Sequence, residues 1–211
     1  MLRSLEDLIG TSMIATDGEI GRVRNFLFDD QSWMIRYLVV DVGNWLAGRE
    51  VVISISALDQ PEWEAKAFSA HLTKKQLRNS PNVDSKKPVS RQQEIAMCEY
   101  FGWPAYWDDT IDFEVRSVSP PAGRKFPVHT KEDPHLRSAG DVFGYEVWAN
   151  DSVIGHLENF IVDEASWHIG YLDLKTGDWL HSRSILVPVR WVLSVSWADH
   201  RVNLNHARNL V

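Results

Sequence analysis

The stretch IGRVRNFLFDDQSWMIRYL at residues 20–38 returns, little changed, as IGHLENFIVDEASWHIGYL at residues 154–172. An offset of 134 residues aligns residues 2–77 with residues 136–211 without a gap, and more than twenty of the aligned positions are identical. A repeat of this length decides the architecture before any single element is assigned. The chain is therefore predicted to contain a duplicated domain.

The repeat boundaries and the chain length together predict three parts. Repeat 1 takes residues 1–78, a connector takes residues 79–135, and repeat 2 takes residues 136–211 of the 211 residues. Each repeat is close to the smallest size that a single hydrophobic core stabilises alone. We therefore expect the two repeats to pair within one chain, as a pseudo-dimer, or to be stabilised by a partner, and a homo-oligomer is an alternative.

Composition narrows the classes of function. The net charge is −7 and no basic stripe stands out, which argues against a direct electrostatic contact with nucleic acid or an anionic membrane. The single cysteine, Cys98, excludes an intrachain disulfide and fits a reducing compartment. The chain has no apolar run long enough to cross a bilayer. These features predict a cytoplasmic protein.

Short strands punctuated by turns fill repeat 1. The predicted strands are residues 11–15, 19–28, 33–42, 49–55, 58–63 and 67–71, followed by a short helix at 73–78 with Thr73 as its N-cap. Gly21 and Gly155 stand at matching places in the second strand of each repeat, where they indicate a bulge or a close backbone approach. Closure into a small barrel removes exposed strand edges, so six short strands favour a barrel. The fold class is predicted to be mainly β, with two six-stranded barrels.

The connector differs from both repeats. Ser90 and Gln93 form a capping-box pattern at the start of a predicted helix at residues 91–101, which Gly102 and Pro104 end. The following segment, FGWPAYW at residues 101–107, contains Trp103, Tyr106 and Trp107 and is expected to dock on a surface. The proline-rich remainder, residues 120–135, is expected to be a mobile linker.

The segment LIGTSMIATDGEIGRVRNFLFDDQSWMIRYLVVDVGNWLAGREVVIS, residues 8–54, resembles the PRC-barrel domain. That domain occurs in the H subunit of the photosynthetic reaction centre and in a bacterial ribosome maturation factor. The connector stretch SRQQEIAMCEYFGWPAYW resembles the middle of bacterial proteins that carry two such domains in tandem. The resemblance implies small six-stranded barrels that serve as docking or assembly modules, and it brings no shared catalytic residue.

Patterns typical of catalytic or metal sites are missing from the sequence. The eight histidines show no zinc-ligand spacing, and neither a nucleophile elbow nor a glycine-rich phosphate loop occurs. Asp29 and Asp163 open acidic turns that could offer oxygen ligands to a cation, but aspartate side chains also stabilise tight turns by themselves. We expect the turn role, no enzyme activity, no cofactor and no metal.

The duplicated tryptophans are candidates for packing or for binding. Trp33 and Trp167 begin the most apolar strand and are expected in the barrel core. Trp45 and Trp179 lie in a predicted loop, where each could cover a barrel end or anchor a partner, since tryptophan is enriched at interfaces. The candidate interaction surface comprises Trp45, Trp179, Trp103, Tyr106 and Trp107.

These observations favour a non-enzymatic interaction or assembly module with a protein partner. The alternative is an adaptor in ribosome or RNA maturation that acts through a ribosomal protein, because the acidic charge disfavours direct RNA contact.

Overall fold

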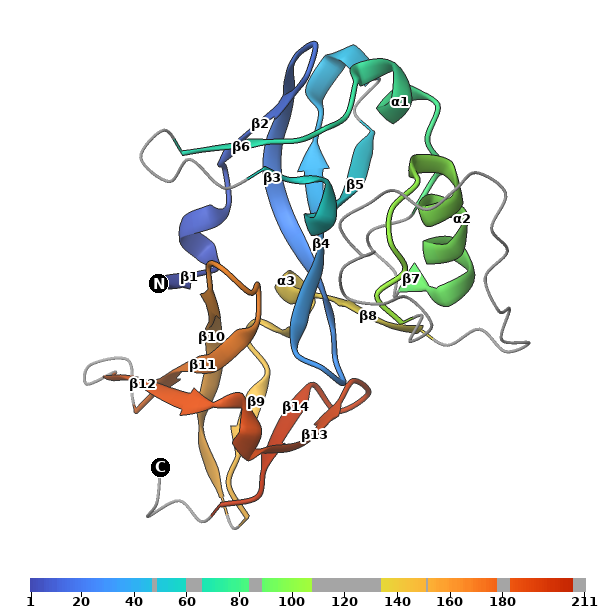
Figure 1. Ribbon diagram of the computed structural model, residues 1–211. Helices are drawn as coiled ribbons and strands as arrows, with labels where there is room; N and C mark the ends of the chain where they lie inside the picture. The colour runs from blue at the N-terminus through green and yellow to red at the C-terminus, as the bar shows by residue number, and fades with distance from the viewer. Residues whose placement is uncertain are drawn as a thin grey trace. The chain divides into compact units, whose positions relative to one another are not determined.

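The computed structural model describes residues 1–46, 49–59, 66–83, 89–107, 134–150, 152–177 and 183–206 (Figure 1). The chain divides into two compact units, and each draws on both repeats. The second-repeat unit comprises Met1–Ile9, Ser32–Ile35 and Ala139–Val211, and the first-repeat unit comprises Gly10–Gln31 and Arg36–Ser138. The units thus interleave along the chain.

The second-repeat unit contains a sheet in which the described residues form seven strands. Six run in the order β12-β11-β10-β9-β14-β13, and β1 pairs with β10. All neighbours are antiparallel except β14 and β9, which are parallel. The strands are β1 (Leu2–Ser4), β9 (Glu146–Trp148), β10 (Val153–Asp163), β11 (Ile169–Thr176), β12 (Arg183–Pro188), β13 (Val192–Ser196) and β14 (Arg201–Leu204).

The sheet of the first-repeat unit repeats this plan over its described residues. Five strands run in the order β5-β4-β3-β2-β6, with β2 and β6 parallel, and β8 pairs with both β3 and β7. The strands are β2 (Ser12–Ala15), β3 (Gly18–Asp29), β4 (Met34–Asp41), β5 (Glu50–Ser54), β6 (Ala67–Ser69), β7 (Val89–Ser90) and β8 (Pro134–Ser138). The predicted mainly β, duplicated fold is confirmed.

The opening strands of the two repeats are exchanged. β1 belongs to repeat 1 but pairs with β10, placing Leu2 opposite Asp163. β8, which begins repeat 2, pairs with β3 in the same register and places Leu136 opposite Asp29. Both strands contain the sequence Leu-Arg-Ser, so each unit receives the same three residues from the other repeat.

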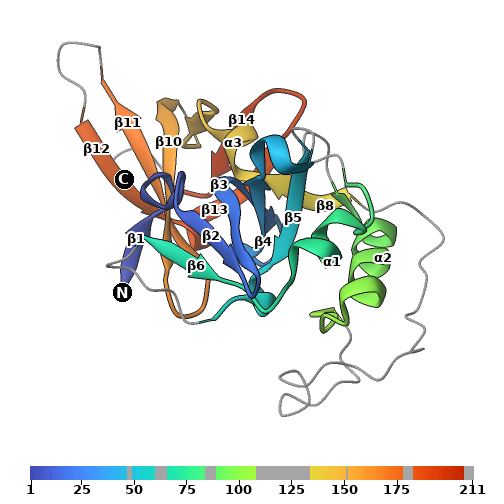
Figure 2. The ribbon, with the colours of Figure 1, turned by 90° about the horizontal axis from the view of Figure 1, so that it is seen from above.

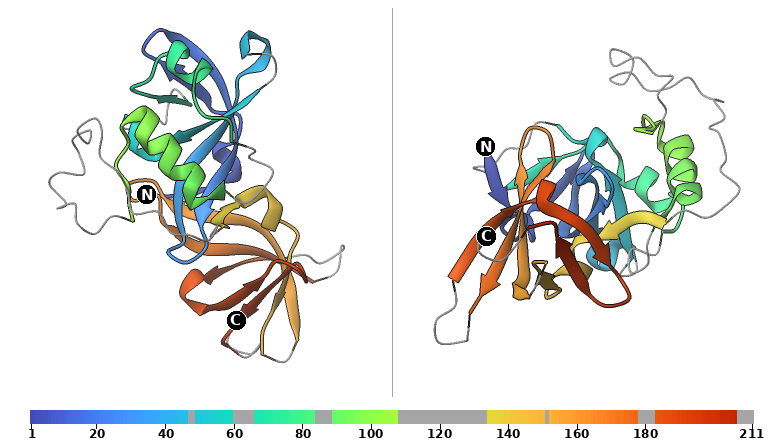
Figure 3. Two further views of the ribbon diagram at one scale, coloured as in Figure 1. Left: turned by 90° about the vertical axis from the view of Figure 1, so that its right-hand side faces the viewer. Right: turned by 90° about the horizontal axis from the view of Figure 1, so that it is seen from below.

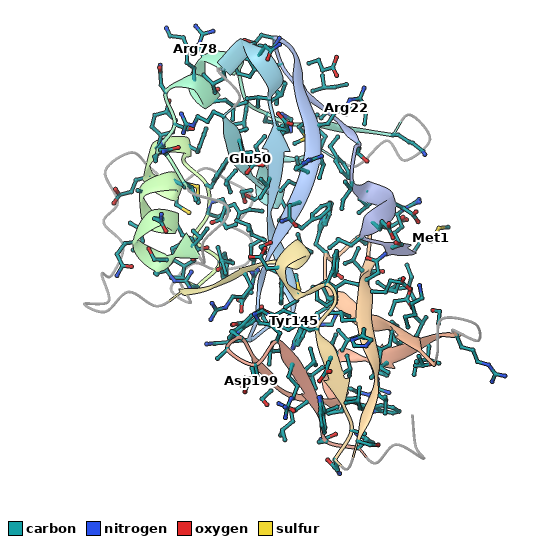
Figure 4. All side chains as sticks on the ribbon, turned by 180° about the vertical axis from the view of Figure 1, so that it is seen from behind. Met1, Arg22, Glu50, Arg78, Tyr145 and Asp199 are labelled. Carbon is teal, nitrogen blue, oxygen red and sulfur yellow. The ribbon has the colours of Figure 1, made fainter. Side chains whose placement is uncertain are left out.

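Matching side-chain contacts secure the two exchanged strands. In the first-repeat unit the Asn25 amide donates to the Ser138 hydroxyl over 2.8 Å, and Asn159 donates to Ser4 over 2.6 Å in the second-repeat unit. The ion pairs of the two units also correspond. The Arg137 Nε lies 3.1 Å from the Asp30 carboxylate, and the Arg3 Nε lies 2.6 Å from the Glu164 carboxylate. Met1, beside β1, also accepts a hydrogen bond from the Glu164 backbone and is labelled in Figure 4. These side-chain contacts therefore fix the register of β1 on β10 and of β8 on β3.

The helices follow the sequence prediction closely. α1 (Lys74–Arg78) has Thr73 as its N-cap, and the Asp17 carboxylate also accepts a hydrogen bond from the Lys74 backbone over 2.9 Å. α2 (Arg91–Phe101) opens with the predicted capping box of Ser90 and Gln93 and ends at Gly102 in the left-handed conformation. A short helix, α3 (Ala139–Val142), and 3-10 turns at Glu6–Leu8, Gly43–Leu46, Ile55–Ala57 and Val189–Trp191 complete the described elements.

Trp33 and Trp167 lie just before the strands that they were expected to open, by one residue and by two residues. β4 begins at Met34, and the φ of Trp33 is 56°, while that of Trp167 is 60°. Bulky side chains seldom adopt this left-handed conformation. Trp167 is buried, and Trp33 is half-buried with its ring 6.1 Å from that of Phe160. Both rings therefore pack, but from a turn.

Candidate interaction surface

Helix α2 lies against the outer face of β4 and β5 in the first-repeat unit (Figures 2 and 3). Tyr37 and Val39 of β4 share this face with Val52, and all three are buried. Glu94, Met97 and Cys98, at the i, i+3 and i+4 spacing of one helical face, are buried on α2. The helix therefore has a docking face that includes a carboxylate.

Glu94 has no exposed surface and stands at the centre of a polar cluster. Its Oε1 accepts hydrogen bonds from the Tyr37 hydroxyl at 3.1 Å and the Tyr106 hydroxyl at 2.9 Å. Its Oε2 lies 3.0 Å from the Arg91 guanidinium. A buried charge is costly unless it is paired and hydrogen-bonded, and this carboxylate is both. The cluster thus ties helix, strand and the segment after the helix together.

Two arginines stack on the aromatic rings of this segment. The Arg36 guanidinium lies 3.7 Å from the Tyr106 ring centre, and that of Arg91 lies 3.8 Å from the Trp107 ring centre. Such contacts add attraction because the ring face carries negative charge density. Arg36 also pairs with the Asp29 carboxylate at 3.4 Å. Tyr106 and Trp107 are therefore engaged within the first-repeat unit.

Burial perturbs the acids around Glu94. Desolvation, followed by the nearby charge of Glu94, raises the pKa of the Tyr37 hydroxyl and that of the Tyr106 hydroxyl well above the usual value for tyrosine. The same two causes raise the pKa of the Cys98 thiol to about 12. All three groups stay protonated at neutral pH, which suits a packed polar cluster and gives Cys98 little thiolate for nucleophilic chemistry.

Trp103 of the connector also faces inward. Trp103 is 5% exposed, its ring stacks on that of Phe101 at 4.1 Å, and it lies 6.2 Å from the ring of Tyr37. Trp103 is thus buried inside the unit. The part of the connector at residues 108–133, with most of the expected mobile linker, lies outside the described residues.

Trp45 is half-buried at the end of the first-repeat barrel. Its indole N–H donates to the Ile20 carbonyl over 2.6 Å, and the Lys74 ammonium lies 5.9 Å from its ring centre. These contacts hold the ring against strand β3. Its counterpart Trp179 lies outside the described residues.

Gly21 and Gly155 occupy points where another backbone comes too close for a side chain. A Cβ on Gly21 would lie 2.0 Å from the Asp41 carbonyl oxygen, and one on Gly155 would lie 2.4 Å from that of Lys175. Asp41 and Lys175 are themselves counterparts in the repeat. β3 and β10 each have a register shift next to their glycine, so the same irregularity occurs in both strands.

Both acidic turns use aspartate to stabilise the chain reversal. The Asp29 carboxylate accepts from the Gln31 backbone over 2.9 Å, and Asp163 accepts from the backbone of Ser166 over 2.9 Å. The hydrogen bonds from Ser166 lower the pKa of the Asp163 carboxyl. Across the described ranges, no group of three or more acidic, histidine or cysteine side chains is arranged to hold a metal ion.

The face of repeat 2 that corresponds to the α2-covered face is more open. Tyr171 and Asp173 of β11 pair with Pro188 and Leu186 of β12, in the register that Tyr37 and Val39 have in repeat 1. Leu186 is 52% exposed, whereas its counterpart Val52 is 6% exposed. Tyr171, Asp173 and Pro188 are half-buried. We name Ile161, Tyr171, Asp173, Leu186 and Pro188 the repeat-2 face.

Sequence reasoning missed Glu94 and the repeat-2 face. Glu94 falls on the buried stripe that continues through Met97 and Cys98, and a charged residue in such a stripe is the signal that could have identified it. On the second face Leu186 keeps the apolar character of Val52 and Gly170 removes the charge of Arg36, while Asp173 introduces a charge in place of Val39.

A scan against protein families matches the PRC-barrel domain at residues 2–68 and again at residues 134–206. No curated protein matches the chain. Within the described residues, no helix is both long enough and apolar enough to span a membrane. The two matched regions cover the strands of both repeats and leave out the connector with α2. Since they make up more than half of the sequence, the chain belongs to the PRC-barrel domain family.

Proposed function

We propose that this protein is a non-enzymatic protein–protein interaction module whose binding surface is the repeat-2 face. One observation carries the proposal. The same sheet face is buried under α2 in the first-repeat unit, and in the second-repeat unit it exposes 52% of Leu186. Most exposed apolar residues are unremarkable alone, but a face that is covered in one copy and open in the other indicates a binding surface.

The contacts around α2 support this assignment. The connector aromatics Trp103, Tyr106 and Trp107, expected to form an interaction surface, pack within the first-repeat unit. They are engaged in covering the face of their own repeat. The surface available to a partner therefore lies on the other repeat.

Site-specific crosslinking in the cells that make the protein tests the proposal. A photoreactive amino acid replaces Leu186 in the full chain, and in a matched control it replaces Ile14, which is 38% exposed in the first-repeat unit. We expect a discrete protein adduct from position 186 and none of the same size from position 14. Absence of an adduct at 186, or the same adducts from both positions, would overturn the proposal. A ribosomal protein in the adduct would favour the adaptor alternative.

A further inference from the structure

The covered face in repeat 1 is a template for what covers the repeat-2 face. Tyr37 pairs with Ser54 and Val39 with Val52, none of the four is more than 9% exposed, and α2 contacts this face where Glu94 accepts from Tyr37. The covering element is an eleven-residue helix that places a carboxylate on a tyrosine hydroxyl. Repeat 2 presents the same strands in the same register, so a helix is the element that fits its face.

The repeat-2 face keeps the tyrosine but lacks the polar contact. Tyr171 is the counterpart of Tyr37, and among the described residues no hydrogen bond reaches its hydroxyl. Its neighbours are apolar: Ile161 lies opposite on β10, and Pro188 lies opposite on β12. A half-buried tyrosine in an apolar setting offers one polar group around which a helix can be positioned.

The repeat-2 face carries a negative charge that the corresponding face of repeat 1 lacks. Asp173 stands where repeat 1 has Val39, and Gly170 stands where repeat 1 has Arg36. The Ser184 hydroxyl donates to Asp173, which leaves its charge in place. The nearby Lys175 pairs with Glu158 at 3.3 Å, and within the described part of the chain Asp173 has no ion pair. A helix with a carboxylate at the position of Glu94 would thus bring a second negative charge close to Asp173, where repeat 1 has the neutral Val39.

We infer that the repeat-2 face binds an amphipathic helix of a partner protein, with a lysine or arginine directed at Asp173 and Tyr171. The inference rests on the proposed function and names the chemistry of its partner. Alternate residues on one strand face are about 7 Å apart, so one long basic side chain reaches both groups. An apolar stripe on either side of that residue covers Leu186 and Pro188.

The test uses peptides derived from α2 and the full-length chain. A peptide of residues 89–107 retains the Ser90–Gln93 capping box, and a chemical staple between positions 96 and 100, both exposed in α2, holds it helical. One peptide carries Glu94→Lys, and its matched control keeps Glu94. We expect the lysine peptide to bind the protein about tenfold more tightly, as an ion pair worth about 1.4 kcal/mol would give.

Charge reversal on the protein makes the test specific. In the Asp173→Lys variant the preference should reverse, so that the peptide with Glu94 binds more tightly than the lysine peptide. Hydrogen exchange should place protection from the bound peptide on β11 and β12, not on β4 and β5. Equal affinities, no binding of either peptide, or a preference unchanged by Asp173→Lys would overturn the inference. A crosslinked adduct at position 186 together with such a result would leave the interaction function standing and reject only the basic helix.

Discussion

Met34 forms an isolated antiparallel bridge with His168, which holds the same position in the other repeat. On either side, the Ile35 backbone donates to Trp167 over 2.9 Å and the Ile169 backbone donates to Trp33 over 2.8 Å. These two hydrogen bonds are copies of one another. Together with the exchange of β1 and β8, they make the contacts between the repeats reciprocal. Each repeat thus contains both the donor and the acceptor of these hydrogen bonds, and both an opening strand and the strand edge that receives one.

A side chain at the strand bend should destabilise the protein. Gly21→Ala places a Cβ within 2.0 Å of the Asp41 carbonyl oxygen, and backbone cannot move aside cheaply. We expect a loss of about 1–3 kcal/mol in the free energy of unfolding, measured by chemical denaturation. The matched control is Gly170→Ala, where the nearest atom lies 3.9 Å from the new Cβ. Equal stability of the two variants would show that the close approach imposes no constraint.

Replacing Asn159, whose side-chain amide donates to β1, should lower the free energy of unfolding more than replacing its hydrogen-bond partner Ser4. Asn159 is 4% exposed, accepts from the Phe160 backbone over 2.8 Å and donates to Ser4 over 2.6 Å. Asn159→Ala leaves buried groups without their partner, and we expect a loss of about 1–3 kcal/mol in thermal or chemical unfolding. Ser4→Ala removes one hydrogen bond and should cost about 1 kcal/mol. A larger effect at Ser4 would contradict this order.

Glu94 should be essential for docking α2. Glu94→Leu deprives two buried tyrosine hydroxyls and Arg91 of their partner, and we expect a loss of about 3–5 kcal/mol in unfolding free energy. Near-ultraviolet circular dichroism should lose aromatic signal as the packing loosens. The control is Glu99→Leu on the same helix, where the side chain is exposed. A wild-type spectrum and stability for Glu94→Leu would mean that the helix docks through apolar contacts alone.

Stability should fall in alkaline solution as the buried thiol and phenols are titrated. The pKa of the Cys98 thiol is about 12 in the folded protein and about 8.5 in an unfolded chain. The folded state therefore resists ionisation, and its stability decreases as the pH rises from about 8.5 towards 12. Tyr37 and Tyr106 shift in the same direction above about pH 10. Urea titrations at a series of pH values measure the decline.

Cys98→Ala separates the thiol from the phenols. The variant should show a smaller decline between about pH 8.5 and pH 10, where tyrosine is still protonated in the unfolded chain. At pH 8, native Cys98 should react slowly with a thiol reagent, and addition of urea should speed the reaction. Fast labelling of the native protein would be evidence that the thiol is accessible.

The helices α1 and α2 could be predicted from the sequence because the residues that start and end them lie beside them in the chain. The capping boxes at Thr73 and Ser90 and the left-handed Gly102 set the bounds of both helices. The offset between repeats aligns Gly21 with Gly155, the two positions at which another backbone comes close. The apolar patterns predicted β2 to β6, although β4 starts after Trp33 because the turn extends one residue further. Of the strand expected at residues 58–63, Leu58 forms an isolated bridge and residues 60–63 lie outside the described part of the chain.

The exchange of opening strands could not be predicted from pattern alone. Residues 2–4 and 136–138 have the same sequence, so nothing local says which sheet each joins. Strand pairing depends on tertiary contacts, here on Asn25 and Asn159. The helical stripe indicates that Glu94 is buried, but no local pattern identifies its partner Tyr37, which is far away in the sequence. Local sequence patterns therefore predict helices and strands, whereas the polar cluster around Glu94 depends on residues that are distant in the sequence.

Reciprocal contacts predict that repeat 1 alone forms a strand-exchanged homodimer. The fragment of residues 1–107 lacks β8, which leaves the edge of β3 at Leu27–Asp29 unpaired. Its own Leu2-Arg3-Ser4 has the sequence of residues 136–138, so β1 of a second copy can take the place of β8. In such a dimer Ser4 and Arg3 of the second copy contact Asn25 and Asp30, as the serine and arginine of β8 do in the full chain. An open strand edge favours such pairing.

Analytical ultracentrifugation of this fragment at micromolar concentration measures the result. We expect a dimer that dissociates on dilution and melts at a temperature that depends on concentration. Arg3→Pro should abolish the dimer, because proline removes a backbone donor and the charge that pairs with Asp30. Arg22→Ala is the control, since that arginine lies outside the exchanged strand and contacts the Gly10 carbonyl. A stable monomer whose melting temperature is unaffected by Arg3→Pro would mean that the opening strand contributes nothing to the pairing of the repeats.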